Sequence, residues 1–190
     1  MPHAIRIHQT GGPEVLCWEA VDLPAPAPGE ATVRHHAVGL NYIDTYHRTG
    51  LYPLPLPSGI GLEGAGVVEA VGEGVTEVKV GDRVAYAGGP IGAYAEARNI
   101  PAHRLLVLPE SISFETGAAM MLQGLTAAYL LRKTYRVQPG DAVLIHAAAG
   151  GVGLIACQWA KALGATVIGT TSSEAKAELA RAHGADHIIF

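Results

Sequence analysis

The chain has 190 residues, of which 49% are hydrophobic and 16% are charged, with a formal net charge of −4. This apolar fraction is ample for a packed core and excludes a disordered or mucin-like chain. The sequence has no cluster of Lys and Arg, so we expect no nucleic-acid-binding face. Its two cysteines, Cys17 and Cys157, form neither a disulfide scaffold nor a four-cysteine zinc lobe, which favours a reducing compartment.

Neither a targeting signal nor a membrane span is expected. The first residues alternate between apolar and polar types, so they lack the continuous apolar region of a signal peptide. Residues 142–160 carry no Asp, Glu, Lys or Arg and approach a membrane-spanning length. However, three glycines interrupt this stretch, which also contains His146 and Gln158. A strand, a glycine turn and a helix explain these residues better than a membrane span.

The first half of the chain is typical of a β domain. Short runs with a period of two are separated by Gly- and Pro-rich loops, a pattern that indicates a barrel-like domain. The expected strands are residues 4–8, 32–38, 67–71, 83–86, 94–99 and 105–108. Proline-rich connectors separate the earlier runs at residues 24–29 and 51–58.

The pattern changes near Pro109. Ser113 is positioned to cap a helix that begins at Phe114, and residues 125–135 indicate a second helix. The rest predicts strand 142–146, a glycine loop, helix 152–163, strand 166–170, helix 174–183 and strand 187–190. This βαβαβ order is typical of a parallel sheet. We therefore place a domain boundary between residues 112 and 113, with a β domain before it and an α/β unit after it.

The glycine loop is the first sign of function. Residues 148–153 fit the dinucleotide fingerprint G-x-G-x-x-G with alanine in the first place. Small residues permit a tight turn and a close approach of pyrophosphate to the helix N-terminus. The expected cofactor contacts here are Ala149, Gly150, Gly151, Val152 and Gly153. The alternative is a plain tight turn between a strand and a helix.

The type of nucleotide is read at the end of the next strand. NAD-binding units usually place an acid there for the ribose 2′-hydroxyl, but residues 169–173 contain none. Thr170, Ser172, Ser173 and the nearby Lys176 instead suit a 2′-phosphate, so NADPH is the expected cofactor. The alternative is that Thr171 or Ser172 merely caps the following helix and that Lys176 is solvated.

Several motifs together carry a resemblance to a known superfamily. They are residues 11–16 (GGPEVL), 41–46 (NYIDTY), 61–66 (GLEGAG), 80–84 (VGDRV) and 147–153 (AAAGGVG). The chain resembles the amino-terminal part of the medium-chain dehydrogenase/reductase superfamily, and within it the zinc-free NADPH:quinone oxidoreductases related to zeta-crystallin. The resemblance implies a GroES-like barrel domain followed by the first half of a Rossmann domain, a doubly wound parallel sheet.

The same resemblance implies that no metal is bound. Zinc-dependent alcohol dehydrogenases, the sister group, carry a Gly-His-Glu segment and an earlier cysteine as ligands. Here the corresponding segment contains Leu62 in place of the histidine, and residues 39–42 contain no cysteine. Catalytic zinc needs three protein ligands, and the nine scattered histidines do not supply them.

The resemblance also assigns the site residues. It implies that a cleft beside the nicotinamide is lined by Asn41, Tyr42, Asp44, Thr45 and Tyr46. Tyr52 is a candidate wall or lid residue, and Gln123 and Thr126 are candidate contacts on the nicotinamide side. Asn41, Tyr46 and Tyr52 are the candidates for a catalytic role. The alternatives are that Asn41 and Asp44 only stabilise a turn and that the two tyrosines only pack.

The implied function is zinc-independent hydride transfer from NADPH to a quinone, by a cytoplasmic homodimer. The alternatives are an NADPH-dependent enone or alkene reductase and a non-catalytic NADPH-binding relative. The chain stops within an apolar strand after one βαβαβ half, so we expect an amino-terminal part of a longer protein rather than a complete small domain. Alone, the 190 residues are expected to bind NADPH poorly, to reduce no quinone and to associate through that open edge strand.

Overall fold

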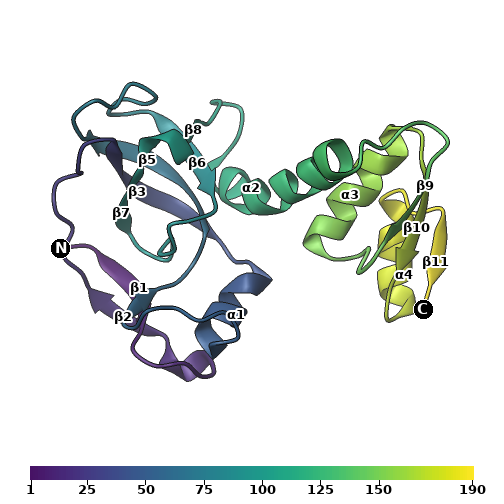
Figure 1. Ribbon diagram of the computed structural model, residues 1–190, viewed down its shortest axis with the longest axis horizontal. Coiled ribbons are helices and arrows are strands. Elements are labelled where there is room, and N and C mark those ends of the chain that lie inside the picture. Colours follow the sequence, from purple (N-terminus) through teal and green to yellow (C-terminus); the bar gives the residue numbers. More distant parts are fainter. The chain divides into compact units, whose positions relative to one another are not determined.

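The computed structural model describes residues 1–190, which divide into two compact units. Unit 1 comprises residues 1–122 and unit 2 comprises residues 123–190 (Figure 1). The division falls within helix α2 (Phe114–Tyr129). The domain boundary predicted after residue 112 lies just before this helix.

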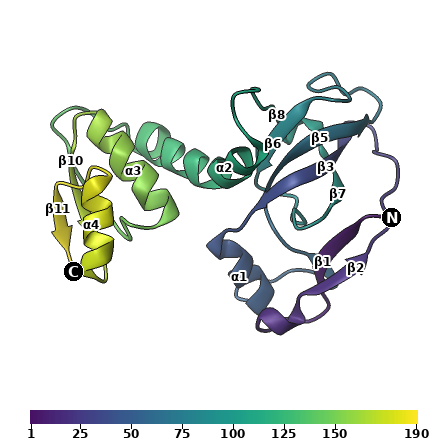
Figure 2. The same cartoon turned by 180° about the vertical axis from the view of Figure 1, so that it is seen from behind.

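Unit 1 contains antiparallel sheets of three and five strands. Their orders are β2-β1-β4 and β7-β3-β5-β6-β8. Figure 2 shows β1 beside β2, and β3 beside β5. The strands are β1 (His3–Ile7), β2 (Cys17–Ala20), β3 (Glu30–Gly39), β4 (Ser58–Gly59), β5 (Glu63–Val71), β6 (Arg83–Ala87), β7 (Ala97–Pro101) and β8 (Leu106–Val107). Two 3₁₀ turns, η1 (Pro13–Val15) and η2 (Ala102–Arg104), connect them. The prediction of a β domain built from many short strands is confirmed.

Strand β5 occupies the centre of the larger sheet because it pairs with both β3 and β6. Its Gly66 faces a register shift in β3 between His35 and Ala37, where the backbones approach closely. A side chain at Gly66 would meet the carbonyl of Arg34, so only glycine permits this approach. The buried cluster over this sheet consists of Ala31, Val33, Val68, Val78, Val84, Tyr86, Ala93, Ile100, Ala102 and Leu105.

Helix α1 (Tyr42–Thr49) interrupts the β domain, and the sequence analysis did not predict it. Asn41 is its N-cap, Asp44 occupies N3 of a capping box, and Gly50 ends it with a left-handed φ of 82°. These were readable signals, but an eight-residue helix among strands shows too little periodicity to stand out. The helix is tied to the loop after β1, since the amide of Gly11 donates to the carbonyl of Arg48 at 3.0 Å.

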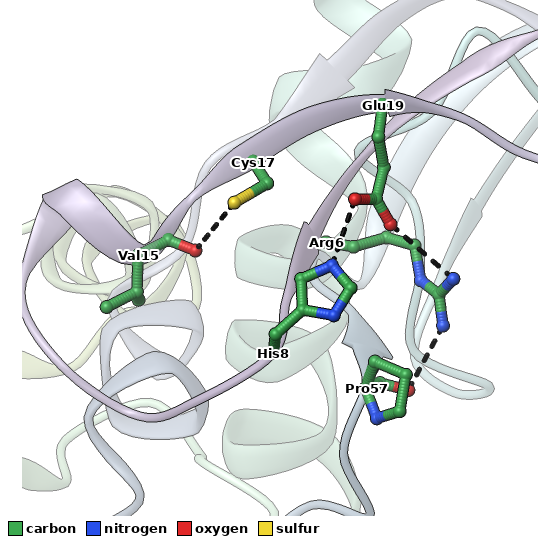
Figure 3. A network of polar contacts seen from close by, with 6 residues as sticks. All are labelled: Arg6, His8, Val15, Cys17, Glu19 and Pro57. Carbon is green, nitrogen blue, oxygen red and sulfur yellow. Dashed lines mark hydrogen bonds and ion pairs between the residues drawn. The ribbon is translucent and has the colours of Figure 1, made fainter.

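The β1–β2 pair carries a polar network on its surface (Figure 3). The carboxylate of Glu19 contacts His8 Nε2 at 2.9 Å and Arg6 Nη1 at 3.5 Å. Arg6 also donates to the carbonyl of Pro57 at 3.2 Å, which ties this hairpin to the proline-rich loop. Because these groups are partly solvated, the network aligns the hairpin more than it stabilises the fold.

Unit 2 is a parallel sheet of order β11-β10-β9 with two connecting helices. Its elements are β9 (Ala142–Ile145), α3 (Gly151–Ala162), β10 (Thr166–Thr170), α4 (Glu174–Ala182) and β11 (His187–Ile189). The predicted βαβαβ order is confirmed, and the bounds differ from the expected ones by one residue or none. No helix of the structure is long and apolar enough to cross a membrane.

The two helices predicted before β9 are instead one continuous helix. α2 runs from Phe114 to Tyr129 and is followed by a π-helical turn, η3 (Leu130–Thr134). Ser113 caps α2 as predicted, because its Oγ accepts the amide of Thr116 at 3.2 Å. The prediction of two separate helices was wrong, since Gly124 lies inside α2 with a helical backbone; a single glycine within a helix is tolerated at a modest energetic cost.

His35, on β3, is held in a neutral state by its surroundings. One ring nitrogen, Nδ1, lies 2.7 Å from the carbonyl of Ala95, and Nε2 lies 2.8 Å from the hydroxyl of Tyr86. A carbonyl only accepts, so Nδ1 carries the proton and Nε2 accepts from the tyrosine. Burial lowers the pKa of His35 to about 4, helped by the charge of Arg98 and opposed by the Ala95 hydrogen bond.

We predict that acid destabilises unit 1 through this histidine. The pKa is lower in the folded than in the unfolded chain, so the stabilisation is present above the unfolded pKa and is lost as the pH falls toward about 4. The free energy of unfolding should drop by about 2 kcal/mol between roughly pH 7 and pH 5. Urea unfolding of wild type and His35→Gln at both pH values tests this. An equal drop in the variant would assign the acid sensitivity to other groups.

Candidate functional site

The turn between β9 and α3 has a strained, tightly bonded backbone. Ala147 has a φ of 51°, the one non-glycine residue with a positive φ in the structure. The amide of Gly150 donates to its carbonyl at 2.8 Å, and its own amide donates to Thr170 Oγ1 at 3.2 Å. A left-handed alanine costs conformational energy, and such strain is concentrated at ligand sites. The turn is therefore built for close backbone approach, as the fingerprint predicts.

The glycines of the turn are required by space. A side chain at Gly153 would meet the carbonyl oxygen of Ala147 and lie 2.7 Å from that of Ala148, so α3 packs against the turn only without one. A side chain at Gly151 would strike the amide group of Gln123, which places Gln123 beside the start of α3. Thr126 lies one helical turn after Gln123 on α2 and is half-buried.

A pocket of about 480 Å³ opens over this turn. Its lining residues are Ala147, Ala149, Gly150, Thr170, Thr171, Ser172, Lys176 and Phe190. Lys176 is the only charged side chain among them, and its Nζ donates to Ser172 Oγ at 3.2 Å. The Oγ1 of Thr171 is buried and has no hydrogen-bond partner. Hydroxyls, a cation and no carboxylate side chain make a pocket suited to a phosphate monoester.

The structure divides the predicted cofactor residues into two groups. Ala149, Gly150, Thr170, Ser172 and Lys176 line the pocket, whereas Gly151, Val152 and Gly153 form the first turn of α3. Ser173 is the N-cap of α4, and its Oγ accepts the amide of Lys176 at 3.4 Å. The alternative that Thr171 or Ser172 caps this helix is wrong, because the cap lies one residue further along. Sequence reasoning missed Ala147, Thr171 and Phe190 as lining residues.

In unit 1, three predicted residues gather at the start of α1. Asn41, Asp44 and Thr45 line a cavity of about 60 Å³. Asp44 Oδ2 accepts the backbone amide of Asn41 at 2.9 Å and the hydroxyl of Tyr94 at 2.7 Å, while Oδ1 is buried without a protein partner. Burial, the Asp44 hydrogen bond and nearby negative charge raise the pKa of Tyr94, so this phenol stays protonated and donates.

Sequence reasoning gave no role to Glu63, which joins this cluster through Asn41. Its side chain is 1% exposed, and its Oε2 accepts from Asn41 Nδ2 at 2.7 Å. Its Oε1 accepts the backbone amide of Leu122 at 2.7 Å. The available signal was a carboxylate within the glycine-rich, apolar segment 61–66, since charged residues are almost never fully buried without partners.

The predicted tyrosines form a separate aromatic ladder, which we define as Tyr42 and Tyr46 on α1 and Tyr52 in the loop after it. The ring centroids of Tyr42 and Tyr46 are 5.3 Å apart with an edge-on angle of 81°. Those of Tyr46 and Tyr52 are likewise 5.3 Å apart, and Tyr52 also meets His47 at 6.0 Å. Tyr42 is 74% and Tyr52 48% exposed, so the ladder presents aromatic surface to solvent. Such surface suits a planar, unsaturated ligand.

The residues of this chain do not fit a catalytic zinc. No group of three or more His, Cys, Asp or Glu side chains is placed to hold a metal ion. Leu62 stands next to the buried Glu63, and the two cysteines are separate, Cys17 exposed and Cys157 buried. Three donors around one open position are therefore not available.

We predict that Gly153→Ala disrupts the turn. The added methyl group meets backbone oxygens that cannot rotate away, so the free energy of unfolding of unit 2 should fall by about 1–3 kcal/mol. Gly124→Ala, in open space on α2, is the matched control and should stabilise by up to about 1 kcal/mol. Thermal unfolding of both variants measures this. If Gly153→Ala is as stable as the wild type, the backbone of the turn can move to accommodate the methyl group, and the prediction is wrong.

Two family models match the chain. The alcohol dehydrogenase GroES-like domain matches residues 27–110, within unit 1. The zinc-binding dehydrogenase model matches residues 151–190, within unit 2, although the metal ligands its name implies are not assembled here. The predicted order of a GroES-like domain followed by the start of a Rossmann domain is confirmed.

Named relatives cover the whole chain. A quinone oxidoreductase of Pseudomonas aeruginosa is 59% identical over 97% of this chain and 57% of its own length. A 2-haloacrylate reductase of a Burkholderia species is 49% identical over the full chain and 59% of its own length. The crystal structure of an Escherichia coli quinone oxidoreductase complexed with NADPH superposes with a TM-score of 0.96, at 53% identity, over 99% of this chain and 58% of that one.

The chain thus spans somewhat less than three fifths of the length of the relatives it matches. Both units contribute to the match, and the motifs at residues 41–46, 61–66 and 147–153 lie at the clusters described above. Over its whole length the chain is similar to the quinone oxidoreductases of the medium-chain dehydrogenase/reductase superfamily.

Proposed function

We propose that the protein containing this chain is a zinc-independent oxidoreductase that transfers hydride from NADPH to a quinone. The observation that carries the proposal is the pocket of unit 2. There a strained glycine turn meets Thr171, Ser172 and Lys176 with no carboxylate side chain in the lining. The quinone oxidoreductases of P. aeruginosa and E. coli, the latter complexed with NADPH, support the same assignment.

The pocket residues fit NADPH by their chemistry. The N-terminal amides of α3 offer donors and a positive dipole end to the pyrophosphate. The ammonium of Lys176 and the hydroxyls of Thr171 and Ser172 offer charge-assisted hydrogen bonds to a 2′-phosphate. A side-chain carboxylate, which would hold a 2′-hydroxyl and repel a phosphate, is missing from the lining.

NADPH supplies the hydride when it is bound, so the protein has to orient the reactants and exclude water. We assign this task in unit 1 to Asn41, Tyr42, Asp44, Thr45 and Tyr46, and in unit 2 to Gln123 and Thr126. Asn41 is held by Glu63 and by the cap of α1, which gives its amide a defined orientation. Preorganised polar groups of this kind contribute to rate because they need no rearrangement during the reaction.

The aromatic ladder is the proposed contact for the acceptor. A quinone is planar and stacks on or against the edges of aromatic rings. Hydride addition to a quinone gives a delocalised quinol anion, so a weak proton source is sufficient. The hydroxyl of Tyr46 or Tyr52, or water, meets that requirement.

An alkene or enone reductase is the second candidate, favoured by the 2-haloacrylate reductase at 49% identity. The cofactor pocket would be the same, and the difference would lie in the acceptor. A non-catalytic NADPH-binding protein is the third candidate, since the pocket alone does not imply turnover.

The cellular setting is also part of the proposal. Both cysteines are free, which is consistent with a reducing, cytoplasmic location. A homodimer is proposed from the family resemblance, and sedimentation equilibrium of the complete protein measures it.

We predict that Lys176→Ala in the complete protein weakens NADPH binding by about 1–3 kcal/mol, because a charge-assisted hydrogen bond to the 2′-phosphate is lost. NADH, which lacks that phosphate, should bind almost as before. Lys161→Ala is the matched control, since Lys161 pairs with Asp186 at 2.5 Å and does not line the pocket. Fluorescence titration with both cofactors gives the dissociation constants. Equal losses for NADPH and NADH would show that Lys176 does not read the phosphate.

We predict NADPH oxidation by the complete protein with 1,4-benzoquinone, and a loss of about two- to tenfold in kcat/KM for Tyr46→Leu, the size of one aromatic contact. Tyr135→Leu, which removes an exposed tyrosine outside the ladder, should change little. Stopped-flow absorbance of NADPH follows the reaction. Turnover only with a 2-haloacrylate or an enone would favour the second candidate, and tight NADPH binding without any turnover would favour the third.

A further inference from the structure

Glu63 is a buried carboxylate that no cation neutralises. It is 1% exposed at the start of β5, and its hydrogen-bond partners are neutral N–H groups. Burying a carboxylate is unfavourable unless hydrogen bonds replace its hydration. Burial raises the pKa of Glu63, with the charge of Asp44 adding to the rise and the hydrogen bonds from Asn41 and Leu122 opposing it. Because burying the Glu63 carboxylate costs free energy, we look for a function of this side chain that an apolar residue of similar size could not perform.

The carboxylate joins three elements of unit 1. Its Oε2 accepts from the side chain of Asn41, the N-cap of α1, and its Oε1 accepts from the backbone of Leu122 in α2. Gly39, the last residue of β3, has no room for a side chain because one would meet Glu63 Oε2 and the carbonyl of Ala118. The Glu63 carboxylate therefore lies against three elements: the end of β3, the start of α1 and the middle of α2.

Both oxygens of Glu63 accept hydrogen bonds, Oε2 from Asn41 Nδ2 and Oε1 from the amide of Leu122, and this decides the orientation of Asn41. The two ends of an asparagine amide are nearly equal in shape, so packing alone does not distinguish them. Facing Glu63 Oε2, Asn41 must turn its NH₂ group toward the carboxylate, and its carbonyl oxygen then accepts the backbone amide of Asp44 in the capping box of α1. The backbone of Asn41 is fixed independently by its hydrogen bond to Asp44.

We propose that Glu63 is a positioning residue that sets which end of the Asn41 amide is presented to the reactants. The inference rests on the proposed function, because the role of Asn41 in hydride transfer belongs to it. Glutamine has the same size as glutamate but carries one donor group. The backbone amide of Leu122 cannot change its polarity, so in Glu63→Gln the new side chain would keep its oxygen on Leu122 and turn its NH₂ toward Asn41. Asn41 would then have to flip.

The test is a double-mutant cycle in the complete protein with Glu63→Gln, Asn41→Ala and the pair. Glu63→Gln should lower kcat for quinone reduction by roughly tenfold, the scale expected for a misoriented positioning group, with the preference for NADPH over NADH unchanged. In the Asn41→Ala background the same substitution should have almost no further effect. If the loss of kcat in the double variant equals the product of the two single losses, the proposal is overturned, since Glu63 would then not act through Asn41.

Tyr86→Phe is the matched control for lost stability. It removes a buried hydroxyl on β6 that bonds the ring of His35 on β3, and it leaves Asn41 untouched. It should lower the thermal midpoint and leave kcat unchanged. A parallel loss of kcat in Tyr86→Phe at an equal drop in midpoint would assign the effect of Glu63→Gln to destabilisation and overturn the proposal.

A readout that needs no turnover separates this proposal from the proposed function. In a ¹⁵N–¹H spectrum of the complete protein, the side-chain amide of Asn41 is identified by its disappearance in Asn41→Ala. The signal should resist hydrogen exchange in wild type and lose that protection in Glu63→Gln. Unchanged protection of this signal in Glu63→Gln would overturn the role of Glu63. If the protection is lost in Glu63→Gln but the wild type reduces no quinone, the role of Glu63 stands and the proposed quinone reduction is rejected.

Discussion

Unit 1 depends on satisfying one buried carboxylate. Glu63 cannot be taken out of water until N–H donors reach both of its oxygens, and those donors come from α1 and α2. The requirement links residues far apart in the chain, 22 positions for Asn41 and 59 for Leu122. Because the same asparagine caps α1, the polar network that closes the core also sets the position of the helix that carries the tyrosines.

Unit 2 is organised by the opposite requirement, the absence of side-chain atoms. α3 starts directly on the turn after β9 because Gly153 lets two backbone carbonyls approach it. The buried core of unit 2 also contains small residues, among them Ala148, Ala156, Cys157 and Ala160, which permit close packing. Close packing of helix on sheet places the start of α3 directly after Ala149 and Gly150, which line the pocket.

Much of unit 2 was predictable because its elements are long, periodic and bounded by local signals. The glycine turn, the absence of an acid at residues 169–173 and the position of Lys176 all follow from spacing along the chain. The residues missed there, Thr171 and Phe190, line the pocket only through the three-dimensional course of the backbone. The alternative that Thr171 or Ser172 caps α4 was wrong because the chemically similar Ser173 is the cap.

Unit 1 was less predictable. Helix α1 has only eight residues and lies between strands, so local periodicity could not outweigh its β context. The role of Glu63 depends on contacts with Asn41 and Leu122 that no local pattern encodes. Tyr94 likewise reaches Asp44 across 50 residues. Long-range hydrogen bonds of this kind become visible only in the folded chain.

The aromatic ladder stands on a helix that is fixed at both ends, by Asn41 at the start and by Gly50 at the end. Tyr42 and Tyr46 are one helical turn apart, and Tyr46 is braced edge-on against Tyr52. The rings therefore lose much of their rotational freedom during folding rather than when a ligand arrives. If the ladder contacts the acceptor as proposed, a flat ligand meets side chains that are already ordered, so less conformational entropy is lost when it binds.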